Sequence, residues 1–153
     1  MESIRIIDYS PSLQPHFESI NKAWIIEHFT LEPIDVAVLE KPQENIIDQG
    51  GVIIFAELEG KIVGTVALKC HEEGVYEMTK MGVVPAAQGK KVGWALAQAI
   101  LSKAESLGAK KVVLYSSRKL TPAINMYRKL GFKEVVPEAG KYSRCDIKME
   151  VDI

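Results

Sequence analysis

The feature that most constrains the fold is a strand–helix–strand unit in the second half of the chain. Residues 75–84 form a β-type run that ends at Pro85, residues 89–107 place apolar side chains at helical spacing, and residues 111–117 form a second β-type run. Two strands that are joined through such a helix are expected to lie parallel, with a right-handed crossover. The sequence therefore predicts a sheet that contains at least one parallel pair.

The remaining segments predict further, mostly antiparallel, strands. Glu59-Gly60 and Glu73-Gly74 separate apolar runs and predict tight turns that join three strands into a meander. Other strands are expected at 3–9, 133–136 and 143–153, and helices at 13–29, 33–41 and 121–131. In the last helix, Thr121 is the expected N-cap, Pro122 the first helical residue and Gly131 a left-handed C-terminal residue.

Length and composition are those of a soluble globular protein with a single domain, expected over residues 1–153. The formal net charge is −1, so no global charge attracts nucleic acid or an anionic membrane. The N-terminus lacks the pattern of a signal peptide, and Cys70 and Cys145 are expected to be reduced thiols, which favours a cytoplasmic location. The three dispersed histidines lack metal-ligand spacing, so no metal site is expected.

Residues 88–94, QGKKVGW, follow a strand and open the long helix, and two interpretations of them compete. In the first, the unpaired N–H groups and the macrodipole of the helix N-terminus bind a phosphate or pyrophosphate, with Gly89 and Gly93 allowing close approach and Lys90 and Lys91 adding charge. In the second, the segment is a solvated basic turn. It contains neither G-x-x-x-x-G-K-[ST] nor G-x-G-x-x-G, so these residues alone leave both interpretations open.

Three segments together resemble, in order and spacing, the core of the GNAT acetyltransferase superfamily. They are YEMTKMGVVPAAQGKKVGWAL, KKVVLYSS and TPAINMYRKLGF. The first is similar to the strand, Q/R-x-x-G-x-G/A loop and helix of the family, and the last to its A-x-x-x-Y-x-x-x-G-F segment. The E-x-x-K-M-x-V-x-P-x-x-Q-G-K run resembles small bacterial members of unassigned substrate. The resemblance covers residues 50–150 well and the N-terminal third in the order of elements only.

This resemblance implies an α/β (mixed α+β) fold, the acyl-CoA N-acyltransferase fold. Its sheet would have about seven mostly antiparallel strands, with helices on both faces, and its central parallel pair would be splayed at a bulge near Gly82. It also implies an acetyl-CoA-dependent N-acetyltransferase that transfers acetyl directly to a primary amine of a small molecule or peptide. A homodimer is a further possibility, because dimers are common among the proteins that the chain resembles.

The resemblance also implies a binding site for coenzyme A. The backbone N–H groups that would wrap its pyrophosphate belong to Gln88, Gly89, Lys90, Lys91, Val92, Gly93 and Trp94. The backbone of Met81 and Val83 would pair with the pantetheine arm as an added strand does, and one of their N–H groups would polarise the acetyl carbonyl. Two positions depart from the family: Lys91 stands where its first loop glycine is usual, and Leu120 where an asparagine is frequent. Asn125 is a further candidate for that role.

Two residues are candidates for catalysis. Tyr127 falls on the family's tyrosine and would protonate the departing thiolate, although a tyrosine that anchors the helix in the core would look the same. Glu77 lies four residues before Met81, hence on the same face of a regular strand, and would take the proton of the amine unless it is simply ion-paired. Glu57 and His71 are alternative bases.

Other residues are candidates for the wall of an acceptor site. Trp24 and Phe29 would line it, or pack in the core, and Arg144 would meet CoA or an acidic acceptor group, or form a surface salt bridge. Two other functions stay open: a non-catalytic CoA-binding sensor or interaction module, and a nucleotide-binding module. The failed phosphate motifs count against the second of these.

Overall fold

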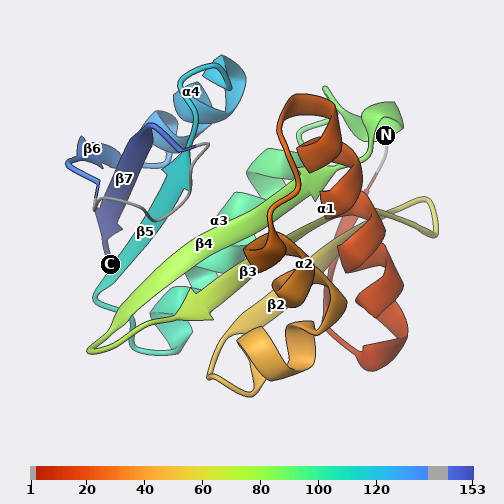
Figure 1. The fold of residues 1–153 in the computed structure, drawn as a ribbon, viewed down its shortest axis with the longest axis horizontal. Helices are drawn as coiled ribbons and strands as arrows, with labels where there is room; N and C mark the ends of the chain where they lie inside the picture. Colours follow the sequence, from red (N-terminus) through yellow and green to blue (C-terminus); the bar gives the residue numbers. More distant parts are fainter. Residues whose placement is uncertain (1–2, 138–144) are drawn as a thin grey trace.

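A seven-stranded sheet runs through the molecule, with helices on both of its faces (Figure 1). The computed structural model describes residues 3–137 and 145–153. The strands are β1 (Ile4–Asp8), β2 (Val52–Leu58), β3 (Lys61–Cys70), β4 (Val75–Val83), β5 (Lys111–Ser116), β6 (Lys133–Val135) and β7 (Ile147–Asp152), in the spatial order β1-β2-β3-β4-β5-β7-β6. Among the described strands, only β4 and β5 pair in parallel, which confirms the predicted mixed sheet.

The helices cover two separate hydrophobic clusters. They are α1 (Gln14–His28), α2 (Pro33–Glu40), α3 (Val92–Ser106) and α4 (Thr121–Lys129), with short helical turns at Pro11–Leu13, Gln43–Ile47 and Pro85–Ala87. On one face, Phe17 of α1 and Leu39 of α2 pack with Phe55 of β2. On the other face, Leu96 of α3 and Tyr127 of α4 belong to the larger cluster. Apolar burial on both faces explains why the central strands are apolar on both sides.

The two tight turns form as the sequence predicts. Glu59 and Gly60 have φ of 51° and 78°, and Glu73 and Gly74 have φ of 53° and 80°. Two successive residues with positive φ match the right-handed twist of the strands that they join. The β2–β3–β4 meander is therefore confirmed.

Two predicted helix starts are wrong by a few residues. The long helix begins at Val92 instead of residue 89, because Gly89 (φ 81°) and Lys91 (φ 64°) are left-handed and cannot continue an α-helix. The N-cap of α4 is Leu120 instead of Thr121, since the Leu120 carbonyl already accepts a hydrogen bond from the Ile124 N–H at 3.0 Å. Pro122 is tolerated in this first turn because its missing N–H would have no helical partner.

Strand β4 contains a bulge and then leaves its parallel neighbour. Opposite β3, Thr79 faces Ala67 and Gly82 faces Thr65, so β4 contains one extra residue between these two pairs. Lys80, within this interval, has a φ of 55°. The pairing of β4 with β5 ends at Glu77, and beyond it the two strands diverge (Figure 1). The predicted splayed pair is confirmed, with the bulge at Lys80 and Met81, directly before Gly82.

Candidate active site

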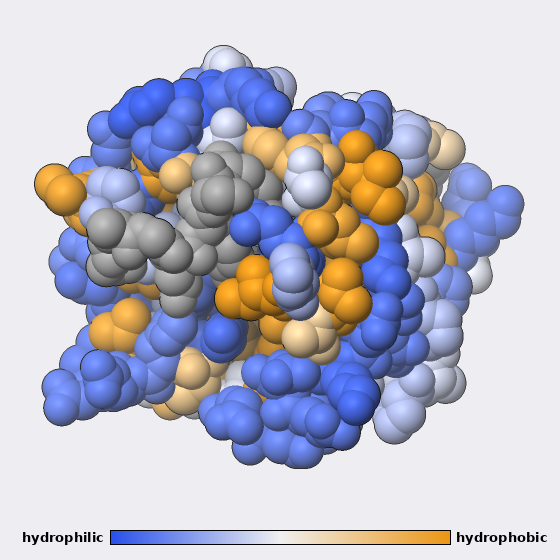
Figure 2. Space-filling model, viewed as in Figure 1, coloured by the Kyte–Doolittle hydropathy of each residue, from blue (hydrophilic) through white to orange (hydrophobic). Residues whose placement is uncertain are grey.

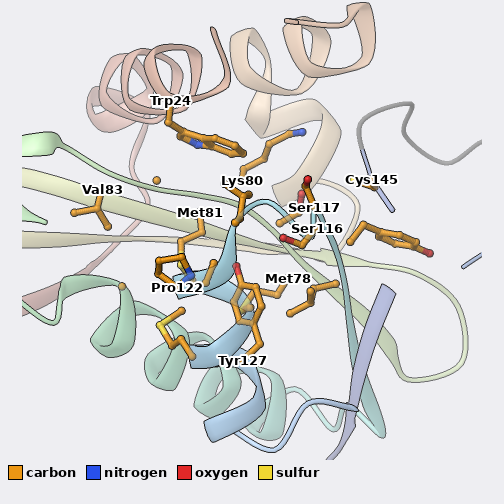
Figure 3. A pocket seen from close by; sticks show the side chains of 18 of the residues that line it. Trp24, Met78, Lys80, Met81, Val83, Ser116, Ser117, Pro122, Tyr127 and Cys145 are labelled. Atoms are coloured by element: carbon orange, nitrogen blue, oxygen red, sulfur yellow. The ribbon is translucent and has the colours of Figure 1, made fainter. Parts of the chain in front are cut away.

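A cavity of about 520 Å³ lies where β4 and β5 diverge (Figure 3). Strand β4 contributes residues from Glu77 to Val83, and β5 with the loop that follows contributes residues from Leu114 to Ser117. Beyond Glu77, no strand among the described residues pairs with the edge of β4 that faces β5. The backbone groups of Met81 and Val83 therefore lie on an open edge, of the kind to which an extended ligand can add.

A second cavity, of about 310 Å³, lies at the N-terminus of α3. It is lined by Lys91, Val92 and Trp94, among others. It shares with the larger cavity the residues Val83, Gln88, Gly89, Gly93 and Met126. The two cavities therefore adjoin, and together they form one elongated site from the divergent strands to the start of α3.

The start of α3 is open to an anion. Its N-cap is Lys91, which makes no side-chain capping hydrogen bond, and its first turn contains no acidic residue. The first hydrogen bond within the helix runs from the Ala95 N–H to the Lys91 carbonyl, at 3.1 Å. The N–H groups before Ala95 point out of the helix end, where the macrodipole also favours negative charge. The chemistry of this loop thus fits a phosphate group.

Lys91 holds a backbone conformation that glycine adopts more easily. A side-chain residue in the left-handed region costs about 1 kcal/mol relative to glycine, which has no Cβ to clash. We expect Lys91→Gly to raise the free energy of unfolding by about 1 kcal/mol, measured by urea denaturation. Lys90→Gly is the matched control, because Lys90 is also exposed but has no positive φ. A Lys91→Gly variant no more stable than Lys90→Gly would contradict the expectation.

Tyr127 enters the larger cavity from α4, and only 9 % of it is exposed (Figure 3). Its ring packs edge-on against Phe132, with the ring centroids 5.9 Å apart. Burial raises the pKa of the Tyr127 hydroxyl to about 12, because the phenolate would lose its hydration. The hydroxyl therefore keeps its proton at neutral pH and can act as a donor at the cavity.

Glu77 lines the same cavity, but the expectation that it shares a face with Met81 is wrong. Met81 packs against the cluster beneath α3 and α4. Glu77 pairs with Lys69 and, two residues on, Thr79 pairs with Ala67, which belongs to the cluster beneath α1 and α2. The extra residue of the bulge resets the alternation of side chains, so Glu77 and Met81 face opposite sides of the sheet.

The three candidate bases are in different surroundings. The Glu77 side chain is 1 % exposed, and its Oε1 lies 2.9 Å from Nε2 of His71. Glu57 instead accepts a hydrogen bond from Arg5 at 3.2 Å on β1 and β2. Among the described residues that line the larger cavity, Glu77 is the only one with a carboxylate side chain. His71 does not line the cavity, but it contacts Glu77, which does.

Trp24 and Phe29 line the larger cavity at its α1 side and also pack against the cluster beneath α1 and α2, so both alternatives left open by the sequence apply to them. Their rings lie edge to face, 6.3 Å apart. The Trp24 N–H donates to Oδ1 of the buried Asn21 at 2.9 Å, which fixes the indole. A Cβ added at Gly82 would lie 2.7 Å from Trp24, so the indole lies against β4 only because residue 82 is glycine.

The molecular surface on the side of the sheet that α1 and α2 cover is mixed in polarity. On the face covered by α1 and α2, hydrophobic side chains gather near the centre and hydrophilic ones surround them (Figure 2). Trp24 and Tyr127 approach the cavity from opposite sides, with Lys80 and Met81 between them (Figure 3). The site therefore has an aromatic side and a side with the Tyr127 hydroxyl, joined through the gap in the sheet.

Some expected site residues are not brought together. Lys90 and Asn125 line neither cavity, and Asn125 is exposed on α4. Leu120 lines the larger cavity. Arg144 lies outside the described residues. Asn125 is therefore not placed for the role of the family's asparagine.

Several residues that line the larger cavity were not predicted from the sequence. Ser116, Ser117 and Cys145 line the larger cavity. The two serines end a strand with a parallel neighbour, and ligands of α/β sheets bind at such carboxyl ends, so this signal could have identified them. Cys145 carries no comparable signal. In the part of the chain that the structure describes, there is no group of three or more His, Cys, Asp and Glu side chains placed to hold a metal ion.

No helix within residues 3–137 and 145–153 combines the length and the apolar character that crossing a membrane requires.

Comparison with known sequences finds a family match over most of the chain. The sequence model described as "Acetyltransferase (GNAT) family" matches residues 14–132. The mycothiol acetyltransferase of Pseudarthrobacter chlorophenolicus is 32 % identical over 111 residues, which are 69 % of this chain and 34 % of that protein. That of Saccharomonospora viridis is 36 % identical over 107 residues, 65 % of this chain and 35 % of that protein. The chain thus spans about a third of the length of these curated relatives.

Solved structures resemble the whole fold. A GNAT-family acetyltransferase from Staphylococcus aureus superposes with a TM-score of 0.87 at 20 % identity, covering 98 % of this chain and 99 % of that one. The PaiA N-acetyltransferase of Thermoplasma acidophilum, solved in complex with coenzyme A, has a TM-score of 0.77 at 18 % identity, with 99 % of both chains covered. At these identities the likeness establishes the fold.

Proposed function

The chain belongs to the acetyltransferase (GNAT) family, and from that premise we propose that it is an acetyl-CoA-dependent N-acetyltransferase. Acetyl would pass directly from the thioester to a primary amine of a small molecule or peptide. The observation that carries the proposal is the elongated site, in which the gap between β4 and β5 continues to the uncapped N-terminus of α3. An extended thioester ligand with a pyrophosphate needs both of these features.

The proposed binding uses mainly backbone groups. The N–H groups of residues 88–94 would hold the pyrophosphate, with Lys91 at the rim of the smaller cavity. The open edge at Met81 and Val83 would pair with the pantetheine arm. This use of backbone explains how a lysine can stand at position 91, because its left-handed φ preserves the direction of the chain that a glycine would provide.

The proposed reaction has two proton transfers, one on each side of the sheet. Glu77, directly or through water, takes a proton from the attacking amine, and His71 holds the Glu77 carboxylate at 2.9 Å. A backbone N–H at Met81 or Val83 polarises the acetyl carbonyl. Tyr127 donates its proton to the departing thiolate, and the carbon–sulfur bond breaks as the carbon–nitrogen bond is completed.

Binding of CoA is the first test of this function. We expect CoA at about 100 times its Kd to stabilise the protein by about 2.7 kcal/mol, or roughly 5–10 °C in a thermal melt of a chain of this size. Pantetheine, which lacks the nucleotide and the pyrophosphate, is the matched control and should stabilise much less at the same concentration. Equal stabilisation by pantetheine would contradict the role of the α3 N-terminus.

An acetyl-CoA turnover screen over amines separates the enzyme from a non-catalytic CoA-binding sensor. Release of free thiol with any amine supports the enzyme. Stabilisation by CoA without thiol release across a broad panel of small amines, polyamines, amino acids and peptide N-termini favours the sensor. Absence of any stabilisation by CoA overturns both functions together.

A further inference from the structure

A buried ion pair joins α2 to the bulge of β4. Nζ of Lys80 lies 2.7 Å from Oδ1 of Asp35, and the two side chains are 4 % and 0 % exposed. Removing two charges from water costs free energy that their attraction does not always return, so such a pair is weak evidence for stability. In some proteins such a pair is retained because it specifies one local arrangement.

The backbone of Lys80 is the part of β4 that needs such a constraint. Lys80 has a φ of 55° and lies within the one-residue bulge. A residue with a side chain is disfavoured in this conformation and would otherwise relax toward regular β geometry. Relaxation would move the next residue, Met81, which lines the larger cavity. The side chain of Lys80 points the other way, toward α2, where it is anchored.

The anchor itself is fixed in place. Oδ2 of Asp35 accepts a hydrogen bond from the Glu32 N–H at 3.0 Å, and the Glu32 side chain in turn accepts one from the Asp35 N–H, which together form a capping box at the start of α2. Asp35 therefore presents its other oxygen to Lys80 from a defined position. The pair spans 45 residues of sequence and connects two elements that no turn links.

We propose that the Lys80–Asp35 pair is a positioning device that holds the β4 bulge in its left-handed conformation. In doing so it sets the divergence of β4 from β5 and directs the backbone groups of Met81 and Val83 into the larger cavity. Lys80 is a positioning residue that acts through the backbone of its neighbours. That the ligand is acyl-CoA rests on the proposed function. That the Lys80–Asp35 pair holds the bulge does not rest on it.

The test removes both charges together. Lys80→Met alone would leave the Asp35 carboxylate buried without its cation, and could unfold the protein for that reason. In the double variant Lys80→Met/Asp35→Asn, both groups are neutral and close in shape, and the amide oxygen can still accept from the Glu32 N–H. We expect this variant to unfold cooperatively but to bind CoA about tenfold more weakly in calorimetry, because the backbone is no longer preorganised. Lys22→Met, which breaks partly exposed pairs with Glu18 and Glu40, is the control and should not change the affinity.

A glycine variant separates positioning from stability. Lys80→Gly/Asp35→Asn loses more packing than the methionine variant and should melt lower, but glycine adopts a positive φ without strain. We expect it to bind CoA more tightly than Lys80→Met/Asp35→Asn despite that lower stability. The proposal would be overturned if the affinity for CoA followed the melting temperature across the series. It would also be overturned if the Kd of Lys80→Met/Asp35→Asn for CoA were within about twofold of the wild-type Kd.

A measurement without ligand keeps this proposal distinct from the proposed function. In the ligand-free protein, the amides of Gly82, which pairs with Thr65, and Val84, which donates to the Val63 carbonyl at 2.9 Å, should exchange with solvent about tenfold faster in Lys80→Met/Asp35→Asn than in wild type, while that of Phe55 in β2 is unchanged. If wild type does not bind CoA, the proposed function fails and this comparison still decides the role of the pair. Unchanged exchange at Gly82 and Val84 contradicts it.

Discussion

Replacing Tyr127 with phenylalanine should reduce the rate of acetyl transfer by about 100-fold or more, because the departing thiolate loses its proton donor. The ring and its contact with Phe132 remain, so the fold should persist. The measurement is thiol release in a single turnover, where chemistry limits the rate. Tyr9→Phe is the matched control, since burial also raises the pKa of Tyr9 but its ring packs on Phe55, away from both cavities.

The pKa of Tyr127 also predicts a pH dependence of stability. The folded-state pKa is raised to about 12, above the usual 10, so the folded protein holds this proton more tightly than the unfolded chain does. The resulting stabilisation is fully present below about pH 10 and is lost as the pH rises toward about 12. Tyr127→Phe lacks this loss, so its stability relative to wild type should rise across that window.

A full rate of acetyl transfer in Tyr127→Phe would disprove the role of Tyr127 as the acid.

Replacing Glu77 with glutamine should lower kcat/KM at neutral pH by about 100-fold, because an amide cannot accept the proton of the amine. Glutamine preserves the shape of the buried side chain and can still hydrogen-bond His71. The remaining activity should increase with pH as the fraction of neutral amine acceptor increases. The measurement is a pH profile of kcat/KM for both proteins with an amine identified in the screen.

Glu57→Gln is the matched control for this variant. Glu57 lies on β2, which β3 separates from β4, is paired with Arg5 and does not line the larger cavity, so its replacement should not change the rate. A Glu77→Gln variant with the wild-type rate, measured where chemistry is limiting, would remove Glu77 from the mechanism. An effect confined to stability would instead show that Glu77 is a buried partner of His71.

Much of this fold could be predicted from local pattern. Alternating and helical apolar spacing predicted the strands and helices, and the Glu-Gly pairs predicted both turns, because these signals act over a few residues. The segments 88–94 and 121–131 were assigned to one site through the resemblance to the family, because local pattern alone left a phosphate loop and a solvated basic turn both open at 88–94. The start of α3 at Val92 was missed, since a lysine in a left-handed conformation has no strong local signal. The N-cap of α4 was predicted one residue too late, at Thr121 instead of Leu120.

The candidate site was predictable in part for the same reason. Gly89 and Gly93 at a helix start and Tyr127 in its motif are local features, and the structure places all three at the cavities. Asn125 was a candidate by residue type, although it lies elsewhere on the helix than the family's asparagine, and α4 exposes it to solvent. Ser116, Ser117 and Cys145 enter the site only because β5 and the segment before β7 converge there.

By itself, the sequence determined the order of elements, the single parallel pair and the resemblance to one family, because each depends on residue types at short, regular spacing. Only the tertiary structure decided the face on which Glu77 lies, since one extra residue in β4 reverses the alternation after it. Only the tertiary structure brought Lys80 to Asp35, 45 residues away. Contacts between distant segments depend on how whole faces pack, which no short window of sequence contains.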